Sequence, residues 1–285
     1  MNVWAAPVAL RDCEFERIRR LAHAQFGLDL KDGKQELVSA RLGKLMRRGG
    51  FTSFKSYCDH VVSDRSGEAL IEMIDALTTN YTSFLREPAH FEFLQHAVRN
   101  EFQAGGAFSP VRIWSAACAT GEEPYSIAFH LVNAGLPLNA FRILATDIST
   151  RALDKARSGV YAADRMVNLP PEWLRRFALQ GNGDSKGLYK VKSEIAQTIE
   201  FRRLNLMEPF CDPETYHVVF CRNVMMYFDR SAQADLVRRL AARLVAGGYL
   251  FVGHSESLTG LEQPLAYCRP AIYRNGPARN RRGPS

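Results

Sequence analysis

The chain has 285 residues, of which 46% are hydrophobic and 24% are charged. This composition is typical of a soluble globular protein with one large or two ordinary domains. The sequence contains no run of about 18 apolar residues, so no membrane-spanning helix is expected. The first ten residues lack a basic region and lead into charged sequence, which argues against a signal peptide and favours a cytoplasmic protein.

The formal net charge of +7 is concentrated near the C-terminus. Residues 269–285 contain five arginines and no acidic residue, so the remaining 32 basic side chains are balanced by 30 acidic ones. We therefore expect residues 276–285 to form a basic disordered tail, and the charge does not indicate a nucleic-acid partner. The six cysteines form no CxxC pair and adjoin no histidine cluster, which predicts reduced thiols and neither disulfides nor a metal site.

Residues 1–78 are predicted to form an all-helical domain, because apolar residues recur at helical spacing and no strand pattern interrupts them. One such stripe lies within residues 35–48 and consists of Val38, Leu42, Leu45 and Met46. A second face of the same helix is basic and consists of Arg41, Lys44, Arg47 and Arg48. This face is either a solvated surface that suits the helix dipole or a docking surface for an acidic partner helix.

Residues 79–100 are predicted to be an interdomain linker and a helix that begins after Pro88. The segment TTNYTSFLRE (78–87) holds more polar chemistry than a connection needs, including Asn80, Thr82 and Arg86. The alternative interpretation is a capping segment that ends one helix and starts the next.

Residues 101–275 alternate between strand and helix patterns, which predicts an α/β domain with a doubly wound, mostly parallel sheet. The stretch VRIWSAACATGEEPYSIA (111–128) is predicted to be a buried strand, a small-residue turn and a helix start, where a ligand can contact backbone. Glu122 and Glu123 stand in this turn. They argue against a pyrophosphate and for a ligand with hydroxyls, amines or a positive charge, such as S-adenosylmethionine.

Polar residues also follow the later predicted strands. Asp147 ends the strand at 141–149, where an acid commonly binds ribose hydroxyls; the alternative is a cap for the next helix. Asn205 follows another strand, and Arg222 and Asn223 follow the strand at 216–222. Because the carboxyl ends of parallel strands share one edge of a sheet, these groups are expected to surround one nucleotide-like ligand.

Residues 160–203 are predicted to form an inserted antiparallel β-subdomain. Strands are expected at 188–192 and 195–201, after the turn-rich loop GNGDSKG (181–187). The exposed edge of this subdomain could accept a peptide strand, and the alternative is an insertion without such a role. Farther along, a helix is predicted at 232–245, ended by Gly247 and Gly248.

Five segments occur in the order TNYTSFLRE, WSAACATGEEPYSIA, ATDIS, FRRLNL and FCRNVMMYF. Together they resemble the chemotaxis receptor glutamate O-methyltransferases of the CheR family. The resemblance extends from the helical N-terminal domain to about Tyr273. It implies a class I S-adenosylmethionine-dependent methyltransferase domain with a small β-subdomain, joined to a helical N-terminal domain.

The resemblance implies roles for individual residues. The implied cofactor-binding residues are Asn80, Thr82, Arg86, Ala116, Glu123, Asp147, Asn205, Leu206, Arg222 and Asn223. The implied catalytic residues are Arg86, Arg222 and Tyr227, with Tyr227 beside the reacting methyl group. Glu122 is expected to be only a helix-start charge. Leu85 stands where the family often has a phenylalanine, and we expect a change in packing there without a loss of chemistry.

The implied substrate is a glutamate in the cytoplasmic helices of a chemoreceptor, docked on the basic face of residues 35–48. Gly181 and Gly183 resemble the loop of family members that bind a C-terminal receptor pentapeptide. A glutamate with a pKa of about 4.3 is ionised at pH 7, so no general base is needed. Catalysis would then rest on positioning and partial desolvation.

We expect a monomer that needs no metal. Two rival functions remain open on the sequence alone. One is a small-molecule or RNA methyltransferase, which would share the cofactor site, and the other is a non-catalytic sensor of the cofactor.

Overall fold

The computed structural model describes residues 9–78, 82–102, 109–211 and 213–276. Its contacts divide the chain into two compact units. The first unit extends to residue 80 and includes residues 227–229, and the second contains residues 81–226 and the chain from residue 230 onward. Within the described ranges, no helix is long and apolar enough to cross a membrane.

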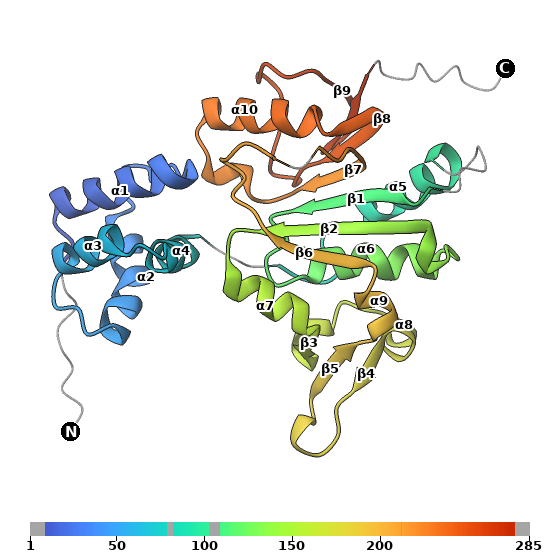
Figure 1. The fold of residues 1–285 in the computed structure, drawn as a ribbon, viewed down its shortest axis with the longest axis horizontal. Helices are drawn as coiled ribbons and strands as arrows, with labels where there is room; N and C mark the ends of the chain where they lie inside the picture. Colours follow the sequence, from blue (N-terminus) through green and yellow to red (C-terminus); the bar gives the residue numbers. More distant parts are fainter. Residues whose placement is uncertain (1–8, 79–81, 103–108, 212, 277–285) are drawn as a thin grey trace. The chain divides into compact units, whose positions relative to one another are not determined.

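The helices of the first unit are shown in blue and teal in Figure 1. They are α1 (Asp12–Phe26), α2 (Gln35–Arg48), α3 (Phe54–Ser63) and α4 (Glu68–Leu77). The helix predicted at 35–48 is confirmed as α2, and Ser53 caps α3 by accepting a hydrogen bond from the backbone N–H of Ser56. Buried side chains from all four helices form the core of this unit, among them Phe15, Leu42, Phe54 and Ile74.

Residues 227–229 also belong to the first unit. The backbone N–H of Asp29 donates to the carbonyl of Tyr227 at 2.7 Å, and Leu28 forms an antiparallel bridge with Phe228. Tyr227 therefore packs by its backbone with the segment that follows α1.

The second unit contains a seven-stranded sheet in the order β6-β2-β1-β7-β8-β10-β9. Its strands are β1 (Val111–Ala116), β2 (Phe141–Asp147), β6 (Ile199–Arg203), β7 (Tyr216–Cys221), β8 (Leu244–Phe251), β9 (Leu265–Arg269) and β10 (Ile272–Asn275). Strand β10 is antiparallel to both of its neighbours, whereas β6, β2, β1, β7 and β8 pair in parallel. The predicted mostly parallel, doubly wound sheet is confirmed.

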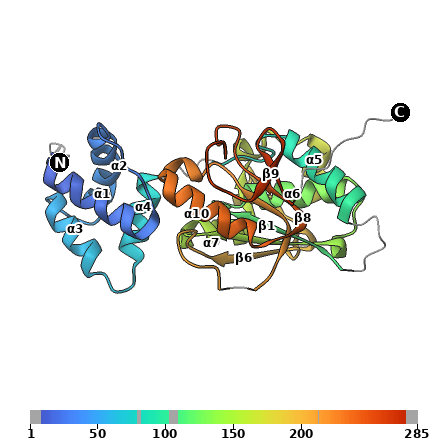
Figure 2. The same cartoon turned by 90° about the horizontal axis from the view of Figure 1, so that it is seen from above.

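Helices pack on the sheet, and several of them connect its parallel strands. They are α5 (Ala89–Ala97) with a π-helical extension (Val98–Phe102), α6 (Glu122–Asn133), α7 (Thr150–Ser158) and α10 (Arg230–Ala241), with a 3₁₀ turn at Leu138–Ala140. Helix α7 packs on β2 and β6, and α10 packs on β8 (Figure 2). The strand order reverses between β1 and β7, and ligands bind at the carboxyl ends of the strands at such a switch point.

The inserted β-subdomain differs in part from its prediction. It is a three-stranded antiparallel sheet in the order β3-β5-β4, built from β3 (Val160–Ala162), β4 (Ala178–Gln180) and β5 (Leu188–Val191). Helix α8 (Pro171–Phe177) and 3₁₀ turns at Ala163–Met166 and Gly183–Ser185 complete it.

The strand predicted at 195–201 was wrong as part of this subdomain. Residues Ser193–Ala196 form α9, and β6 belongs to the main sheet, parallel to β2. Alternating apolar residues predict a strand without showing which sheet it joins.

The boundary after α10 is a second correction. The helix predicted at 232–245 is α10 and ends at Ala241, and Gly247 and Gly248 lie inside β8 instead of ending the helix. The pairing of β7 with β8 shifts register between Tyr216 and Val218. A Cβ on Gly248 would lie 2.9 Å from the carbonyl oxygen of His217, so this glycine permits a close backbone approach within the strand.

Candidate active site

The turn between β1 and α6 has an unusual backbone. Ala117 has a φ of 66°, Ala119 of 48° and Gly121 of 94°, all in the left-handed region that disfavours residues with a Cβ. The turn is held by Cys118, whose N–H donates to the carbonyl of Thr146 at 2.9 Å. Alanine thus occupies two positions where glycine would adopt the same φ at a lower energetic cost. Such backbone strain is common at functional sites.

Asp147 fixes the same turn from the end of β2. One carboxylate oxygen accepts from the N–H of Ala119 at 2.8 Å, and the other accepts from the N–H of Ser149 at 3.0 Å. Ser149 itself caps α7 by accepting from the N–H of Ala152. The helix therefore has its own cap, and Asp147 instead joins the two loops at the carboxyl edge of the sheet.

Arg222 lies at the centre of a buried charge network. Its side chain is only 2% exposed and pairs with Glu123 at 3.1 Å and with Glu87 at 3.1 Å. The guanidinium also donates to the carbonyl of Arg86, and Glu123 accepts from the hydroxyl of Ser115 at 2.7 Å. The network ties the 82–87 segment to the β1–α6 turn and to the end of β7.

The two carboxylates of this network respond differently to their surroundings. Burial raises the pKa of Glu123 despite the opposing charge of Arg222. Burial also acts to raise the pKa of Glu87, but Arg222 and the nearby His254 outweigh it and the pKa is lowered. One guanidinium is thus shared by two acids, so the site favours a ligand that carries positive charge.

The segment 82–87 is anchored in the second unit. Phe84 is fully buried between Phe129 and Tyr161, with ring centroids at 6.0 and 5.0 Å. Leu85 has a φ of 54°, and its N–H donates to the hydroxyl of Ser126 at 2.9 Å. These contacts fix the segment within the second unit and go beyond what a helix cap requires.

Residues after β6 lie beside Asp147. The N–H of Leu204 donates to the Asp147 carbonyl at 3.0 Å, and the Asn205 side chain accepts from the N–H of Met207 at 3.0 Å. Leu206 is buried. The edge of the sheet thus brings together most of the predicted cofactor residues, namely Ala116, Glu123, Asp147, Asn205, Leu206, Arg222 and Asn223.

Comparisons with known proteins match both units. A model of the all-alpha domain of CheR methyltransferases matches residues 14–78, and a model of their S-adenosylmethionine-binding domain matches residues 80–272. The chain belongs to the CheR methyltransferase family. It is therefore an S-adenosylmethionine-dependent methyltransferase.

Curated relatives are similar over nearly the whole chain. The chemotaxis protein methyltransferase of Salmonella typhimurium strain LT2 is 38% identical over 269 residues, which is 93% of this chain and 91% of that protein. Chemotaxis protein methyltransferase 2 of Pseudomonas aeruginosa is 40% identical over 91% of this chain and 92% of its own. The donor set at the sheet edge fits S-adenosylmethionine, since the carboxylates there outnumber the buried cation.

The remaining predicted residues of this CheR-family chain come from segments other than the strand ends. Asn80 lies outside the described residues, and Tyr227 belongs to the first unit. Thr82 lies in the anchored segment, where its carbonyl accepts from Arg165 at 2.9 Å. Gly181 and Gly183 border the loop between β4 and β5.

On the basic face of α2, Arg41 is half-buried and the other three cations are exposed. Arg48 pairs with Glu72 at 2.8 Å, and Arg41 donates to the carbonyl of Leu77. Lys44 and Arg47 are exposed. Two of the four predicted docking cations thus also hold α2 to α4.

Sequence reasoning missed several side chains of the site. Glu122 is fully buried and pairs with Arg165 of the β-subdomain, so it is more than a helix-start charge. Glu87 was visible in the sequence next to Arg86, but nothing in the sequence indicated its contact with Arg222. The role of Arg165 could not be predicted from the sequence, because its partners lie more than forty positions away.

Glu87, His90 and His254 also form a cluster in which three potential ligand atoms lie within 4.8 Å of one another. Burial, together with the charge of Arg222, lowers the pKa of His90 to about 3. Arg222 already pairs with Glu87, so a metal ion there would lie beside a positively charged guanidinium group.

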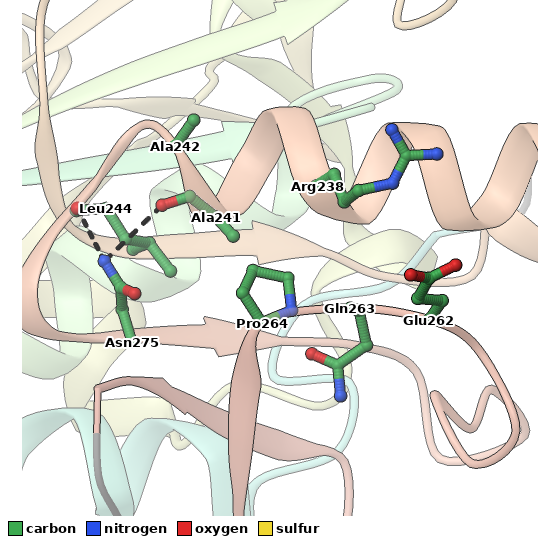
Figure 3. A pocket seen from close by; sticks show the side chains of 8 residues that line it. All are labelled: Arg238, Ala241, Ala242, Leu244, Glu262, Gln263, Pro264 and Asn275. Carbon is green, nitrogen blue, oxygen red and sulfur yellow. Dashed lines mark hydrogen bonds between the residues drawn. The ribbon is translucent and has the colours of Figure 1, made fainter.

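A surface pocket lies at the amino end of β8, whereas the candidate active site lies at the carboxyl ends of the strands (Figure 3). Leu244 begins that strand, and Asn275 donates to the Leu244 carbonyl at 2.9 Å across the pocket wall. Because the predicted cofactor residues follow the carboxyl ends of β1, β2 and β7, this pocket is separate from the candidate active site.

Proposed function

We propose that this protein transfers the methyl group of S-adenosylmethionine to glutamate side chains in the cytoplasmic helices of chemoreceptors. The product would be a glutamate methyl ester, which serves sensory adaptation. The observation that carries this proposal is the family match over both units, with relatives named chemotaxis protein methyltransferases along more than 90% of the chain.

The cofactor is proposed to lie along the carboxyl edge of the sheet. Asp147 would bind the ribose, and Asn205 and Leu206 would contact the adenine. Arg222 and Asn223 would lie near the methionine part of the cofactor, and Glu123 would also contact the cofactor. Arg86, Thr82 and Asn80 would close the site from the linker. The polar convergence at the switch point between β1 and β7 supports this placement.

Arg86 is the better candidate for orienting a carboxylate during the reaction. Arg222 already donates to Glu87, Glu123 and the Arg86 carbonyl, so its guanidinium is committed to the architecture of the site. The substrate glutamate is ionised at pH 7 and needs no base. A residue that held this carboxylate too firmly would stabilise the ground state and slow transfer, so Arg86 and Tyr227 are proposed to position the reacting groups.

Two surfaces are proposed to recognise the receptor. The basic face of α2 would approach the acidic methylated helices. The β-subdomain would bind a C-terminal pentapeptide beside Gly181 and Gly183, because β4 is an edge strand with Leu179 57% exposed. The protein is proposed to act as a cytoplasmic monomer.

The proposal is tested with S-adenosylmethionine labelled in its methyl group and the cytoplasmic fragment of a chemoreceptor. Label should enter the fragment and be released by mild base, as expected for an ester. Transfer into RNA or a small molecule, with none into the receptor fragment, would contradict the proposed substrate.

The residue assignments need a separate comparison. Arg86→Ala and Tyr227→Phe should each lower the turnover number at least tenfold at saturating cofactor. Arg99→Ala, an exposed arginine of the same unit as Arg86, should leave turnover unchanged. Wild-type turnover in both test variants, with cofactor binding intact, would remove these two residues from the mechanism.

A further inference from the structure

We infer that Glu256 is a positioning residue that holds the Arg222–Asn223 turn in its cofactor-binding conformation. Glu256 lies in the segment after β8 and is buried, with 8% of its surface exposed. Its carboxylate bonds to the backbone of the turn, and so it acts on the cofactor through other residues. The inference rests on the proposed role of Arg222 and Asn223 in cofactor binding.

The carboxylate of Glu256 gathers backbone donors from two loops. Oε2 accepts from the N–H of Asn223 at 2.7 Å and from the N–H of Gly253 at 2.7 Å. Oε1 accepts from the N–H of Met226 at 3.2 Å. A buried carboxylate is stable in this position because three N–H groups point at it, and its removal would leave these donors without this acceptor.

Asn223 needs this support because its backbone is strained. Its φ of 59° lies in the left-handed region, where a residue with a Cβ is uncommon. The bond from Asn223 N–H to Glu256 directly fixes this conformation. Releasing it would let the turn relax, and the cofactor would then have to reorder it on binding.

Gly253 makes room for the same arrangement. A Cβ at this position would lie 2.4 Å from Asn223 Nδ2 and 2.9 Å from Glu256 Oε2. The end of β8 can therefore approach the turn only without a side chain. Gly253 and Glu256 together form a bracket that holds the residues following β7 against those following β8.

The bracket also holds the start of the segment that leads to Tyr227. Met226 is its third donor, and it directly precedes Tyr227 in the 3₁₀ turn Met225–Tyr227. One carboxylate thus supports the chain on both sides of Val224. The expected consequence of its loss is weaker cofactor binding, with a smaller effect on turnover once the cofactor has reordered the turn.

The main test compares Glu256→Gln with Glu262→Gln in the full-length protein. Both remove one negative charge from the segment after β8, but Glu262 is exposed. Calorimetric titration with S-adenosylhomocysteine should show about tenfold weaker binding for Glu256→Gln, because an amide nitrogen now faces buried donors. The KM for S-adenosylmethionine should rise similarly, with kcat within about threefold of wild type. Glu262→Gln should match wild type.

Amide hydrogen exchange separates positioning from a general loss of stability. Without ligand, the amides of Asn223, Met226 and Gly253 should exchange at least tenfold faster in Glu256→Gln, and saturating S-adenosylhomocysteine should restore their protection. The amides of β1 and β2 should be unaffected. Unchanged exchange at the three amides would overturn the inference, as would equal acceleration throughout the sheet.

Two further outcomes are also decisive. If Glu256→Gln does not fold, Glu256→Asp and Gly253→Ala perturb the same bracket, and unchanged cofactor affinity in both would overturn the inference. If the wild-type protein binds no S-adenosylhomocysteine, the proposed function fails while the exchange measurement without ligand still decides whether Glu256 holds the turn.

Discussion

Two independent features require glycine at position 121: its backbone conformation and the lack of space for a Cβ. Its φ is 94°, and an added Cβ would lie 2.7 Å from the Cβ of Ala156 and 2.9 Å from the Tyr161 hydroxyl. Tyr161 in turn donates to the carbonyl of Thr120 at 2.7 Å, so it cannot move without releasing the turn. The β1–α6 turn and α7 thus pack so closely that no side chain fits at position 121.

We predict that Gly121→Ala lowers the free energy of unfolding by about 2–4 kcal/mol, from backbone strain plus the collision with α7. Urea denaturation measures this change. Gly43→Ala is the matched control, since its Cβ would meet nothing closer than 3.6 Å inside a helix, and it should stabilise the protein by about 0.5–1 kcal/mol. Equal stability of the two variants would contradict this explanation of Gly121.

His90 should make stability depend on pH. It is 1% exposed, and burial with the charge of Arg222 lowers its pKa to about 3 from an ordinary 6.5. Between these values the unfolded chain binds a proton that the folded chain does not. The stability contribution is therefore complete above pH 6.5 and is lost as the pH falls towards 3, by up to about 1.4 kcal/mol per pH unit.

His90→Phe should remove this slope. Between pH 7 and pH 5, wild type should lose about 2 kcal/mol more unfolding free energy than the variant, measured by urea denaturation without ligand. The neighbouring titratable groups Glu87 and His254 are the same in both proteins. His96→Phe alters an exposed histidine of the same helix and should keep the wild-type slope; a loss of slope there would show that His90 is not its source.

At the scale of elements, the basic face proposed for docking on α2 also contributes contacts to α4. Arg48 contacts Glu72 of α4, and Arg41 contacts the end of the same helix. Lys44, Arg47 and Arg48 are all exposed. A charge reversal at Arg41 would therefore disturb packing as well as docking. Among the four cations of this face, Lys44 and Arg47 give the cleaner test of receptor recognition.

We predict that the double variant Lys44→Glu/Arg47→Glu raises the KM for a receptor fragment at least tenfold at low salt, because favourable steering becomes repulsion. Its affinity for S-adenosylhomocysteine should be unchanged. The control Lys55→Glu/Arg65→Glu reverses two other exposed cations of the same unit and should have little effect. If both double variants lose receptor methylation equally, the overall charge of the unit matters and α2 is not a specific docking surface.

At the scale of the whole molecule, the Arg222 network joins three distant parts of the chain. Glu87 precedes α5, Glu123 lies in α6, and Arg222 follows β7. No local preference could produce this arrangement, because its members are about 100 or more positions from Arg222. Removing the cation would leave two largely buried carboxylates without this partner.

Arg222→Met should therefore lower the unfolding free energy by about 3–5 kcal/mol. Adding Glu123→Gln should recover part of this loss, since one of the uncompensated charges disappears. A double-mutant cycle by urea denaturation measures the coupling, and additive losses would mean that the Arg222–Glu123 pair contributes nothing of its own. Arg243→Met, outside the network, provides the control.

Local patterns were sufficient for many elements. Helical periodicity and turn residues predicted α2 and the strand–turn–helix of 111–128, because these depend on neighbours within a few residues. They misplaced Ile195–Phe201 and the Gly247–Gly248 pair. In both places the missing information was the partner strand, since β6 pairs with β2 and Gly248 lies against the backbone of His217.

The same division holds for the site. Asp147, Asn205 and Arg222 could be predicted from the sequence because each follows a strand whose carboxyl end meets the others at one edge of a parallel sheet. Glu87, Arg165 and Glu256 could not, because their roles come from ion pairs and hydrogen bonds that are mostly to residues far away in the chain. Sequence alone thus determined the family and the sheet, and it predicted the edge at which the cofactor is proposed to bind. The tertiary structure decided which buried charges hold that edge in place, since burial and long-range contact are set only when the whole domain folds.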